Sequence, residues 1–362
     1  MDSLVRMHKG ESMENSIVQD DIKNIINNDL PWHEFEGKTI LITGANGFLP
    51  AYMVETLLYL NDTGLRKKCK IIALVRNVVK AQIRFSKYQD REDFHLLVQD
   101  VCKPLNIRNN IDYIIHAASQ ASPKYYGLDP VGTLSANVIG TYNLLEVARK
   151  KKVKGFLFFS SGEVYGEVNS NQIPTKETDF GFIDPINVRS CYSESKRMGE
   201  TMCISWFHQY GVPVKIVRPF HTYGPGMTLN DGRVFADFVS NIVERSDIVM
   251  KSDGSAIRAF CYLEDAIIGF YTVLLKGKCG EAYNVANSKG EISILNLANI
   301  LANLMPGRKV NVIRCKNEEN KGYLQSKISR NCPDITKVRL LGWEPKYSIE
   351  EGFKRTITSF IL

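Results

Sequence analysis

Residues 38–48, KTILITGANGF, constrain the fold more than any other segment of this sequence. A short apolar run ends at Gly44, Gly47 follows three residues later, and a helical pattern begins near Phe48. Glycine adopts positive φ readily and lets a ligand approach the main chain closely. A strand, a glycine turn and a helix in this order predict a loop whose helical N–H groups face a pyrophosphate. Pro50 replaces a third glycine, which the first helical turn tolerates because it does not need that N–H.

Apolar runs alternate with helical stretches from residue 38 to residue 218. This alternation is typical of a parallel sheet covered by helices on both faces. The predicted fold class is therefore α/β, a doubly wound parallel sheet of the Rossmann type with a smaller C-terminal substrate-binding lobe. The predicted strands are residues 38–43, 70–75, 96–99, 112–116, 155–160 and 213–218. The predicted helices include residues 131–150, 192–210, 294–304 and 349–361.

The pattern changes at both ends of this region. Residues 1–37 are polar and weakly patterned, so we expect an N-terminal extension packed on the outside of the domain. Residues 38–218 form the predicted NAD(P)-binding domain, to which residues 255–290 return. The remaining segments, 219–254 and 291–362, are too broken in pattern for a second full core. We expect them to form a lobe over the C-terminal edge of the sheet, where α/β folds bind ligands.

Composition excludes several classes of protein. The 46 Lys and Arg residues against 39 Asp and Glu residues give a net charge of +7, which is too mild to indicate nucleic-acid binding. No eighteen apolar residues run together and residues 1–16 lack an apolar signal core, so we expect a cytoplasmic protein without a membrane partner. None of the eight cysteines belongs to a C-x-x-C pair, which indicates reduced thiols, and we expect no metal site.

The ends of the second and third predicted strands indicate how the rest of a dinucleotide is held. An acidic residue after the second strand would bind the ribose hydroxyls of NAD(H). Arg76 stands there instead and favours the 2′-phosphate of NADP(H), with NAD(H) as the alternative. Asp100 and Val101 follow the third strand, where they would meet the adenine. In the glycine loop the candidate cofactor-binding residues are Gly44, Asn46, Gly47, Phe48 and Leu49.

Tyr192 and Lys196 are four residues apart at the start of a predicted helix, so their side chains share one face. A nearby cation lowers the pKa of a phenol and lets it exchange protons with a hydroxyl or carbonyl group. Ser161 ends the preceding strand, where its hydroxyl would bond the reacting oxygen. The three residues predict a proton-transfer set beside a nicotinamide, with Lys196 also holding the nicotinamide ribose.

Eight segments together closely resemble the extended short-chain dehydrogenases/reductases that act on nucleotide sugars. They are GANGFLP, HAASQASPKYYGLDP (116–130), SSGEVYG (160–166), YSESK (192–196), VRPFHTYGPGM (217–227), NDGRV (230–234), SAIRAFCYLEDA (255–266) and LGWEP (341–345). The resemblance covers about residues 38–360 and points to the UDP-glucuronate decarboxylases, then to the dTDP-glucose 4,6-dehydratases. It implies a nucleotide-diphosphate sugar oxidised or reduced at C4, and a homodimer formed through helices 131–150 and 192–210.

The resemblance also implies roles for single residues. The implied catalytic residues are Ser161, Glu163, Tyr192 and Lys196, of which the last two would also bind the cofactor, together with Ala117. The implied substrate-binding residues are Ser122 and Tyr126 beside the sugar, His221 near the pyrophosphate in place of a customary asparagine, and Asn230, Arg233 and Arg258 around the nucleotide diphosphate. An arginine fork suits phosphate oxygens in such a site.

Two departures from the family pattern bear on the reaction. Gly162 stands where dehydratases carry the aspartate that expels the C6 hydroxyl and where decarboxylases usually carry a serine. Asn331 replaces a basic residue of the decarboxylases, with Arg330 next to it as a substitute donor for a substrate carboxylate. Dehydration and decarboxylation both need groups that these positions lack.

Simple hydride and proton transfer needs only Ser161, Tyr192 and Lys196, all of which are present. We therefore predict an NAD(P)H-dependent reductase of a 4-keto-6-deoxyhexose nucleotide, such as dTDP-4-dehydro-6-deoxyglucose. The resemblance implies a setting in bacterial surface-polysaccharide synthesis, such as O-antigen and lipopolysaccharide precursors. The alternatives are a UDP-glucuronate decarboxylase that forms UDP-xylose, a nucleotide-sugar 4-epimerase, and a non-catalytic dinucleotide-sensing protein.

Overall fold

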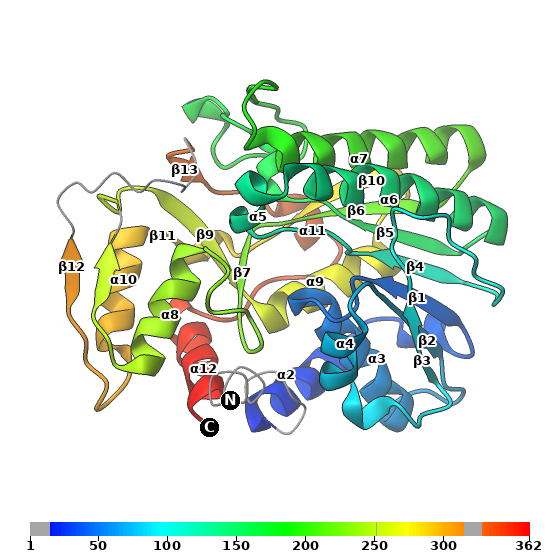
Figure 1. The fold of residues 1–362 in the computed structure, drawn as a ribbon, viewed down its shortest axis with the longest axis horizontal. Coiled ribbons are helices and arrows are strands. Elements are labelled where there is room, and N and C mark those ends of the chain that lie inside the picture. Colours follow the sequence, from blue (N-terminus) through cyan, green and yellow to red (C-terminus); the bar gives the residue numbers. More distant parts are fainter. Residues whose placement is uncertain (1–14, 251, 315–327) are drawn as a thin grey trace.

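A seven-stranded parallel sheet forms the centre of the chain, as the computed structural model shows for residues 15–250, 252–314 and 328–362 (Figure 1). Its strand order is β10-β6-β5-β4-β1-β2-β3, and every neighbouring pair is parallel. The strands are β1 (Thr39–Thr43), β2 (Lys70–Val75), β3 (Phe94–Val98), β4 (Tyr113–His116), β5 (Gly155–Phe159), β6 (Val214–Pro219) and β10 (Glu281–Val285). The predicted doubly wound α/β fold is thus confirmed.

Helices cover both faces of this sheet. Alternate residues of β1 divide between the two layers, because Ile40 and Ile42 pack with one hydrophobic core and Leu41 packs with the other. The helices against the first core are α2 (Ser16–Ile26), α3 (Phe48–Thr63) and α9 (Leu263–Lys276). Those against the second are α6 (Pro130–Lys151) and α7 (Ser190–Tyr210), which pack on each other. Shorter elements around the sheet are α4 (Val78–Arg84), α5 (Pro123–Leu128), η1 (Trp32–Phe35), η2 (Ser86–Tyr88), η3 (Gly162–Tyr165) and η4 (Ser170–Gln172).

The smaller lobe lies at the carboxyl ends of the central strands (Figure 1). It has a hydrophobic core of its own, around Tyr223, Phe235, Phe260, Leu297 and Phe353, which the broken sequence pattern did not predict. Its strands are β7 (His221–Tyr223), β9 (Ile257–Tyr262), β11 (Glu291–Ser293) and β13 (Arg330–Asn331) in one sheet, and β8 (Ile248–Met250) and β12 (Val312–Arg314) in another. Its helices are α8 (Val234–Glu244), α10 (Ile294–Leu304), α11 (Thr336–Arg339), α12 (Ile349–Ile361) and η5 (Ser288–Gly290).

The segment 255–290 divides between the two parts of the chain. Its first strand, β9, pairs with β7, β11 and β13 in the lobe. Its helix α9 packs under the central sheet, and β10 completes that sheet beside β6. The stretch therefore links the two cores instead of returning as a whole to the larger one.

The described part of the N-terminal extension is held by a buried ion pair. Helix α2 lies beside α12 and packs against α3 and α9 (Figure 1). Asp21 on α2 is fully buried, pairs with Arg355 on α12 and accepts a hydrogen bond from the Tyr262 hydroxyl at 2.7 Å. Burial raises the pKa of Asp21, and the Arg355 charge opposes this rise. The extension thus joins the Rossmann helices to the C-terminal helix.

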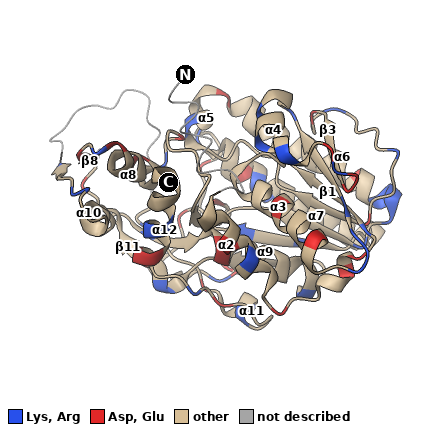
Figure 2. Cartoon of the chain, turned by 90° about the horizontal axis from the view of Figure 1, so that it is seen from below, with Lys and Arg blue, Asp and Glu red and all other residues tan. Residues whose placement is uncertain are grey.

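Charge is mixed over the surface of the molecule. Lys and Arg segments alternate with Asp and Glu segments across the view in Figure 2. The basic cluster at residues 149–151 forms the last turn of α6, where cations complement the helix dipole. Within residues 15–250, 252–314 and 328–362, no helix combines the length and the hydropathy that a membrane crossing requires.

Candidate active site

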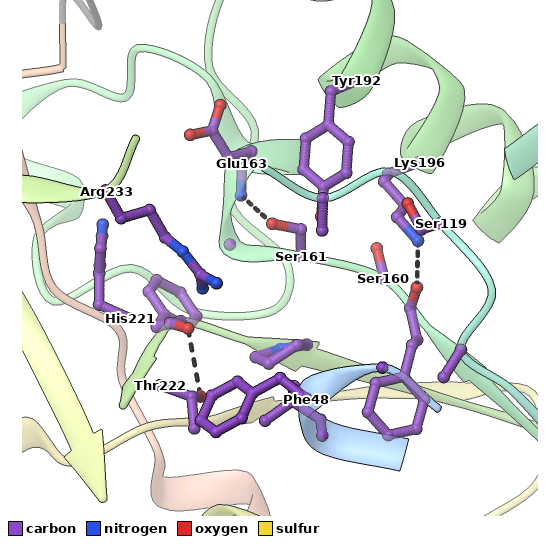
Figure 3. A pocket seen from close by; sticks show the side chains of 18 of the residues that line it. Phe48, Ser119, Ser160, Ser161, Glu163, Tyr192, Lys196, His221, Thr222 and Arg233 are labelled. Atoms are coloured by element: carbon purple, nitrogen blue, oxygen red, sulfur yellow. Dashed lines mark hydrogen bonds between the residues drawn. The ribbon is translucent and has the colours of Figure 1, made fainter. Parts of the chain in front are cut away.

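A cavity of about 290 Å³ lies where the carboxyl ends of the central strands meet the smaller lobe. Both the glycine loop after β1 and the helix α7 contribute to it, which brings residues more than 140 positions apart onto one lining (Figure 3). The predicted residues on the lining are Gly44, Gly47, Phe48, Leu49, Ala117, Tyr126, Ser161, Glu163, Tyr192, Lys196, His221 and Arg233.

The glycine loop has the geometry of a phosphate cradle. Gly44 has φ +63°, and a Cβ there would lie 2.8 Å from the Cα of Ala118. Gly47 is the N-cap of α3 and offers the helix no side-chain cap. The first intrahelical bond runs from Ala51 N to Gly47 O at 3.0 Å, so Pro50 removes an N–H that would have had no partner in the helix. The uncapped N–H groups at this end suit a pyrophosphate.

Replacing Gly44 with alanine is expected to weaken dinucleotide binding at least about tenfold and to destabilise the fold by on the order of 1–2 kcal/mol. The added methyl group meets the Ala118 main chain, and the left-handed backbone disfavours any side chain. The measurement is calorimetric titration with NAD(H) and NADP(H). Gly211→Ala is the matched control, since Gly211 also has positive φ (+69°) but its Cβ would have open space. Equal losses of affinity in the two variants would contradict the cradle.

Tyr192, Lys196 and Ser161 converge on this cavity. Tyr192 is buried, its ring is stacked on Tyr126 at 4.9 Å between centroids, and its hydroxyl points toward the strand end that carries Ser161 (Figure 3). Lys196 donates to the carbonyl oxygen of Phe159 at 2.6 Å, and its Nζ lies 5.7 Å from the Tyr192 ring centroid. The spacing of four residues does place phenol and amine on one face of α7.

The protonation of the pair differs from expectation. Burial raises the pKa of Tyr192 to about 12, a hydrogen bond with Ser161 and the charge of Arg233 oppose the rise, and Glu163 adds to it. Burial lowers the pKa of Lys196 to about 7, while the Glu200 carboxylate counteracts this. The predicted net lowering of the tyrosine pKa is therefore wrong for this structure, because desolvation outweighs the neighbouring charges. At neutral pH the phenol is protonated.

One acidic side chain of the cavity lining, Glu163, forms an ion pair with the basic side chain of Arg189. Glu163 lines the cavity, and its carboxylate accepts from Arg189 at 3.0 and 3.3 Å. The Arg189 guanidinium lies 5.8 Å from the Tyr126 ring centroid. Ser161 Oγ accepts from the main-chain N–H of Glu163 at 3.1 Å, which fixes the turn between them.

Some predicted substrate-binding residues are not on the lining. Asn230 is exposed, and Arg258 donates to the main-chain oxygens of Ile257 and Ile328 at 2.8 Å each. Ser122 borders the lining residues Ala121 and Pro123, and its hydroxyl donates to the main-chain oxygen of Asp231. Of the predicted polar groups for the sugar and diphosphate, the cavity itself brings together Tyr126, His221 and Arg233.

The residues predicted to bind the adenosine end of the cofactor, and Asn46 of the glycine loop, also lie off the cavity. Arg76 is exposed just beyond β2, and Asn46 is half-buried in the glycine loop. Asp100 is half-buried and accepts from Cys102 N at 2.9 Å. Val101 is buried against Gly140 of α6. A dinucleotide would have to extend from the glycine loop along the sheet edge to reach them.

Several lining residues were not predicted from the sequence. The Ser119 hydroxyl is buried without a hydrogen-bond partner and therefore fits a ligand. Ser160 stands next to the predicted Ser161 and is buried. Phe220 and Thr222 come from the lobe side of the cavity, as does Asn331, which the family resemblance had already marked as replacing a basic residue. Ser119 and Phe220 both lie in segments that carry the family resemblance, 116–130 and 217–227, but neither residue was assigned a role there.

This combination of a Rossmann sheet, a glycine loop and a Tyr–Lys pair at one cavity defines an extended short-chain dehydrogenase/reductase. Residues 40–286 match the family described as the NAD dependent epimerase/dehydratase family, and the chain belongs to that family. The prediction of an enzyme with a nicotinamide dinucleotide cofactor is confirmed, and the description of the family names NAD.

Curated relatives extend the match to most of the chain. UDP-glucuronic acid decarboxylase 5 of Arabidopsis thaliana is 33% identical over 315 residues, which are 86% of this chain and 86% of the relative. UDP-glucuronic acid decarboxylase 1 of Xenopus tropicalis is 34% identical over 330 residues, which are 90% of this chain and 73% of the relative.

Solved structures agree with the fold. The UDP-glucose 4-epimerase of Thermotoga maritima, solved with UDP-glucose, has a TM-score of 0.74 and 25% identity and covers 89% of this chain and 98% of its own. The UDP-glucuronic acid 4-epimerase of Bacillus cereus, solved with UDP-glucuronic acid and NAD, has the same TM-score and coverage at 22% identity. At that identity the second likeness bears on the fold alone.

Proposed function

We propose that this chain is an NAD(P)H-dependent reductase of a 4-keto-6-deoxyhexose nucleotide. The observation that carries the proposal is the lining of the cavity. It unites Ser161, Tyr192 and Lys196 with the glycine loop, while on the described lining Glu163 is paired with Arg189 and Arg233 is paired with Asp231. Bound NADPH would supply the hydride. Ser161 would hold the C4 oxygen, and Tyr192 would donate the proton to it.

Gly162, the position where dehydratases carry their catalytic aspartate, lies against the aromatic ring of Phe220. A Cβ at Gly162 would lie 2.7–3.0 Å from three ring atoms of Phe220, so a larger residue there requires that ring to move. Its neighbour Glu163 is engaged by Arg189. Phe220 thus gives the cavity an apolar wall where the family resemblance locates C6, which favours a methyl group over a hydroxyl or carboxylate.

The basic residues on the described lining do not suit a carboxylate. Lys196 donates to the Phe159 carbonyl, Arg233 pairs with Asp231, and His221 is neutral because burial lowers its pKa to about 3. Arg330, the substitute donor, forms an ion pair with Glu291, while Asn331 faces the cavity. A carboxylate bound here would have to share its cation with a protein oxygen.

The protonation of Tyr192 is compatible with the reductive direction. With a pKa of about 12 the phenol holds its proton at neutral pH, as a general acid must. The reverse reaction would need the phenolate, which burial disfavours. A nucleotide-diphosphate sugar as substrate draws support from the names of the relatives and from the UDP-sugars in the epimerase structures. NADPH is proposed over NADH because Arg76 follows β2, and the setting in bacterial polysaccharide synthesis stays part of the proposal.

A UDP-glucuronate decarboxylase is the second candidate, favoured by relatives at 33–34% identity over most of the chain. It would use the same tyrosine to begin oxidation at C4. A 4-epimerase is the third, favoured by the Thermotoga maritima structure at 25% identity. The intact Tyr–Lys pair argues against a non-catalytic sensing protein.

We also propose a homodimer formed through α6 and α7. Large apolar side chains on these two adjacent helices are exposed, which is unusual for a solvated surface. They include Val131, Leu134, Ile139 and Tyr142 on α6, and Met198, Ile204, Phe207 and Tyr210 on α7. Light scattering is expected to give a molar mass near twice that of the chain.

Two parallel incubations test the proposed reaction. With dTDP-4-dehydro-6-deoxyglucose and NADPH, absorbance at the NADPH band is expected to fall in step with loss of the ketone. With UDP-glucuronate and no added cofactor, no CO₂ is expected. Release of CO₂ in the second incubation would overturn the reductase in favour of the decarboxylase.

A further inference from the structure

Glu200 lies one helical turn beyond Lys196, so Tyr192, Lys196 and Glu200 follow one another along a single face of α7. The carboxylate of Glu200 accepts from Arg218 Nε at 2.8 Å and from Arg218 Nη2 at 2.6 Å. It also accepts from the hydroxyl of Ser160, which lines the cavity. The carboxylate therefore connects the catalytic helix with β6 and with the end of β5.

Arg218 is itself held in place by the fold. It is buried, and its Nη1 donates to the Tyr165 hydroxyl at 2.8 Å and to the Glu177 carbonyl oxygen at 2.9 Å. Tyr165 in turn donates to Asn284 Oδ1 at 2.6 Å. A carboxylate that makes a bidentate contact with such a fixed arginine has little freedom to move.

Three consecutive residues at the end of β5, residues 159–161, each make a different contact in the site. Phe159 accepts from Lys196 through its carbonyl oxygen, and Ser160 donates to Glu200. Ser161 is the third, with its hydroxyl at the cavity. Lys196 and Glu200 thus attach α7 to the strand end from which the third member of the proposed catalytic set projects.

We propose that Glu200 is a positioning residue for the Tyr192–Lys196 pair, holding the strand end against α7 and keeping the Lys196 amine protonated. This inference rests on the proposed function of the pair. The charge of Glu200 acts on Lys196 in the required direction. Burial lowers the pKa of the Lys196 amine, and the Glu200 carboxylate is the largest of the influences that raise it. Without that charge, less of the ammonium would remain to hold the ribose and support the phenol.

Other charged and titratable groups surround the two side chains. Among the described residues, four such groups face Lys196: Tyr192, Glu200 and Cys203 on α7, and His116 on β4. Four face Glu200: Lys196 and Cys203 on α7, Tyr165 on η3, and Arg218 on β6. Burial raises the pKa of Cys203 and lowers that of His116, so both are neutral at pH 7. Glu200 is the one carboxylate in this set.

The test titrates Lys196 directly in Glu200→Gln, which keeps the shape of the side chain and removes its charge. The ¹³Cε shift of labelled lysine, assigned with Lys196→Arg, is expected to report a pKa lowered by on the order of one unit. Under the proposed reaction, the fall of kcat toward alkaline pH should move down by the same amount, with KM nearly unchanged. Glu194→Gln is the control, since Glu194 is exposed on the same helix and pairs with Arg197.

An unchanged Lys196 titration in folded Glu200→Gln would overturn the inference, whatever the substrate proves to be. If that variant does not fold, Glu200→Asp retains the charge for Arg218 while withdrawing the carboxylate by one methylene. It is expected to lower the Lys196 pKa by a smaller amount and to reduce kcat, and wild-type values for both would overturn the inference. Full activity of Tyr192→Phe, in contrast, would overturn the proposed function while leaving the Lys196 titration to decide on Glu200.

Discussion

Replacing Tyr192 with phenylalanine is expected to lower kcat by about 10²–10⁴-fold. The substitution deletes one oxygen, and the ring keeps its stacking on Tyr126, so the cavity and the fold should persist. What is lost is the proton that the protonated phenol would give to the C4 oxygen. Dinucleotide affinity should change by no more than about threefold, because the glycine loop is untouched. The measurement is steady-state turnover together with calorimetric titration of the cofactor.

Tyr210→Phe is the matched control for this experiment. Tyr210 ends the same helix, is about half exposed and lies outside the cavity lining. It should retain kcat within about twofold of the unaltered chain. Comparable turnover in Tyr192→Phe and Tyr210→Phe would contradict the role assigned to the buried phenol.

Replacing Arg355 with methionine is expected to destabilise the chain by about 3–5 kcal/mol, because it leaves the carboxylate of Asp21 buried without its cation. Asp21 is fully buried, so water cannot take the place of the guanidinium. The Tyr262 hydroxyl remains as a hydrogen-bond donor to this carboxylate. The measurement is the free energy of unfolding in urea.

The pKa of Asp21 predicts how the stability loss in Arg355→Met depends on pH. Burial raises the pKa of Asp21, so the folded chain favours the protonated acid, and the penalty grows as pH rises from the unfolded pKa through the folded one. The deficit of Arg355→Met should therefore shrink as the solution is acidified toward about pH 7, the folded pKa of Asp21, and level off below it. Asp21→Asn in the same background should recover much of the loss. Arg339→Met, which breaks an exposed pair with Glu344, should cost less than about 1 kcal/mol. Equal costs in the two arginine variants would contradict a structural role for the buried pair.

The sequence predicted the central sheet well because its strands are strongly apolar. Six of the seven strands fall on predicted runs, with ends displaced by no more than two residues. The seventh, β10, reads EAYNV and lacks a clear apolar or alternating pattern. Five of the six described lobe strands are two or three residues long, too short for periodicity to mark them. Their arrangement depends on contacts between distant segments.

The site was predicted where one helix or one loop carries the pattern. The four-residue spacing of Tyr192 and Lys196 survives in the structure because both lie in the first turns of α7. Arg258 shows the limit, since its guanidinium is taken by main-chain oxygens of residues 257 and 328. The sign of the Tyr192 pKa shift also escaped prediction, because it depends on burial of the phenol, on which the Tyr126 ring of α5 is stacked. Spacing along a helix specifies which side chains are neighbours but not how dry their surroundings are.

The most direct test of the central claim follows the hydride itself. A 4-keto-6-deoxyhexose nucleotide is incubated with NADPH that carries deuterium at both C4 positions of the nicotinamide, and the product is analysed by mass spectrometry and NMR. The proposed reductase predicts one deuterium at C4 of the sugar for each NADPH oxidised. A product that forms without deuterium at C4, or without net consumption of NADPH, would contradict it.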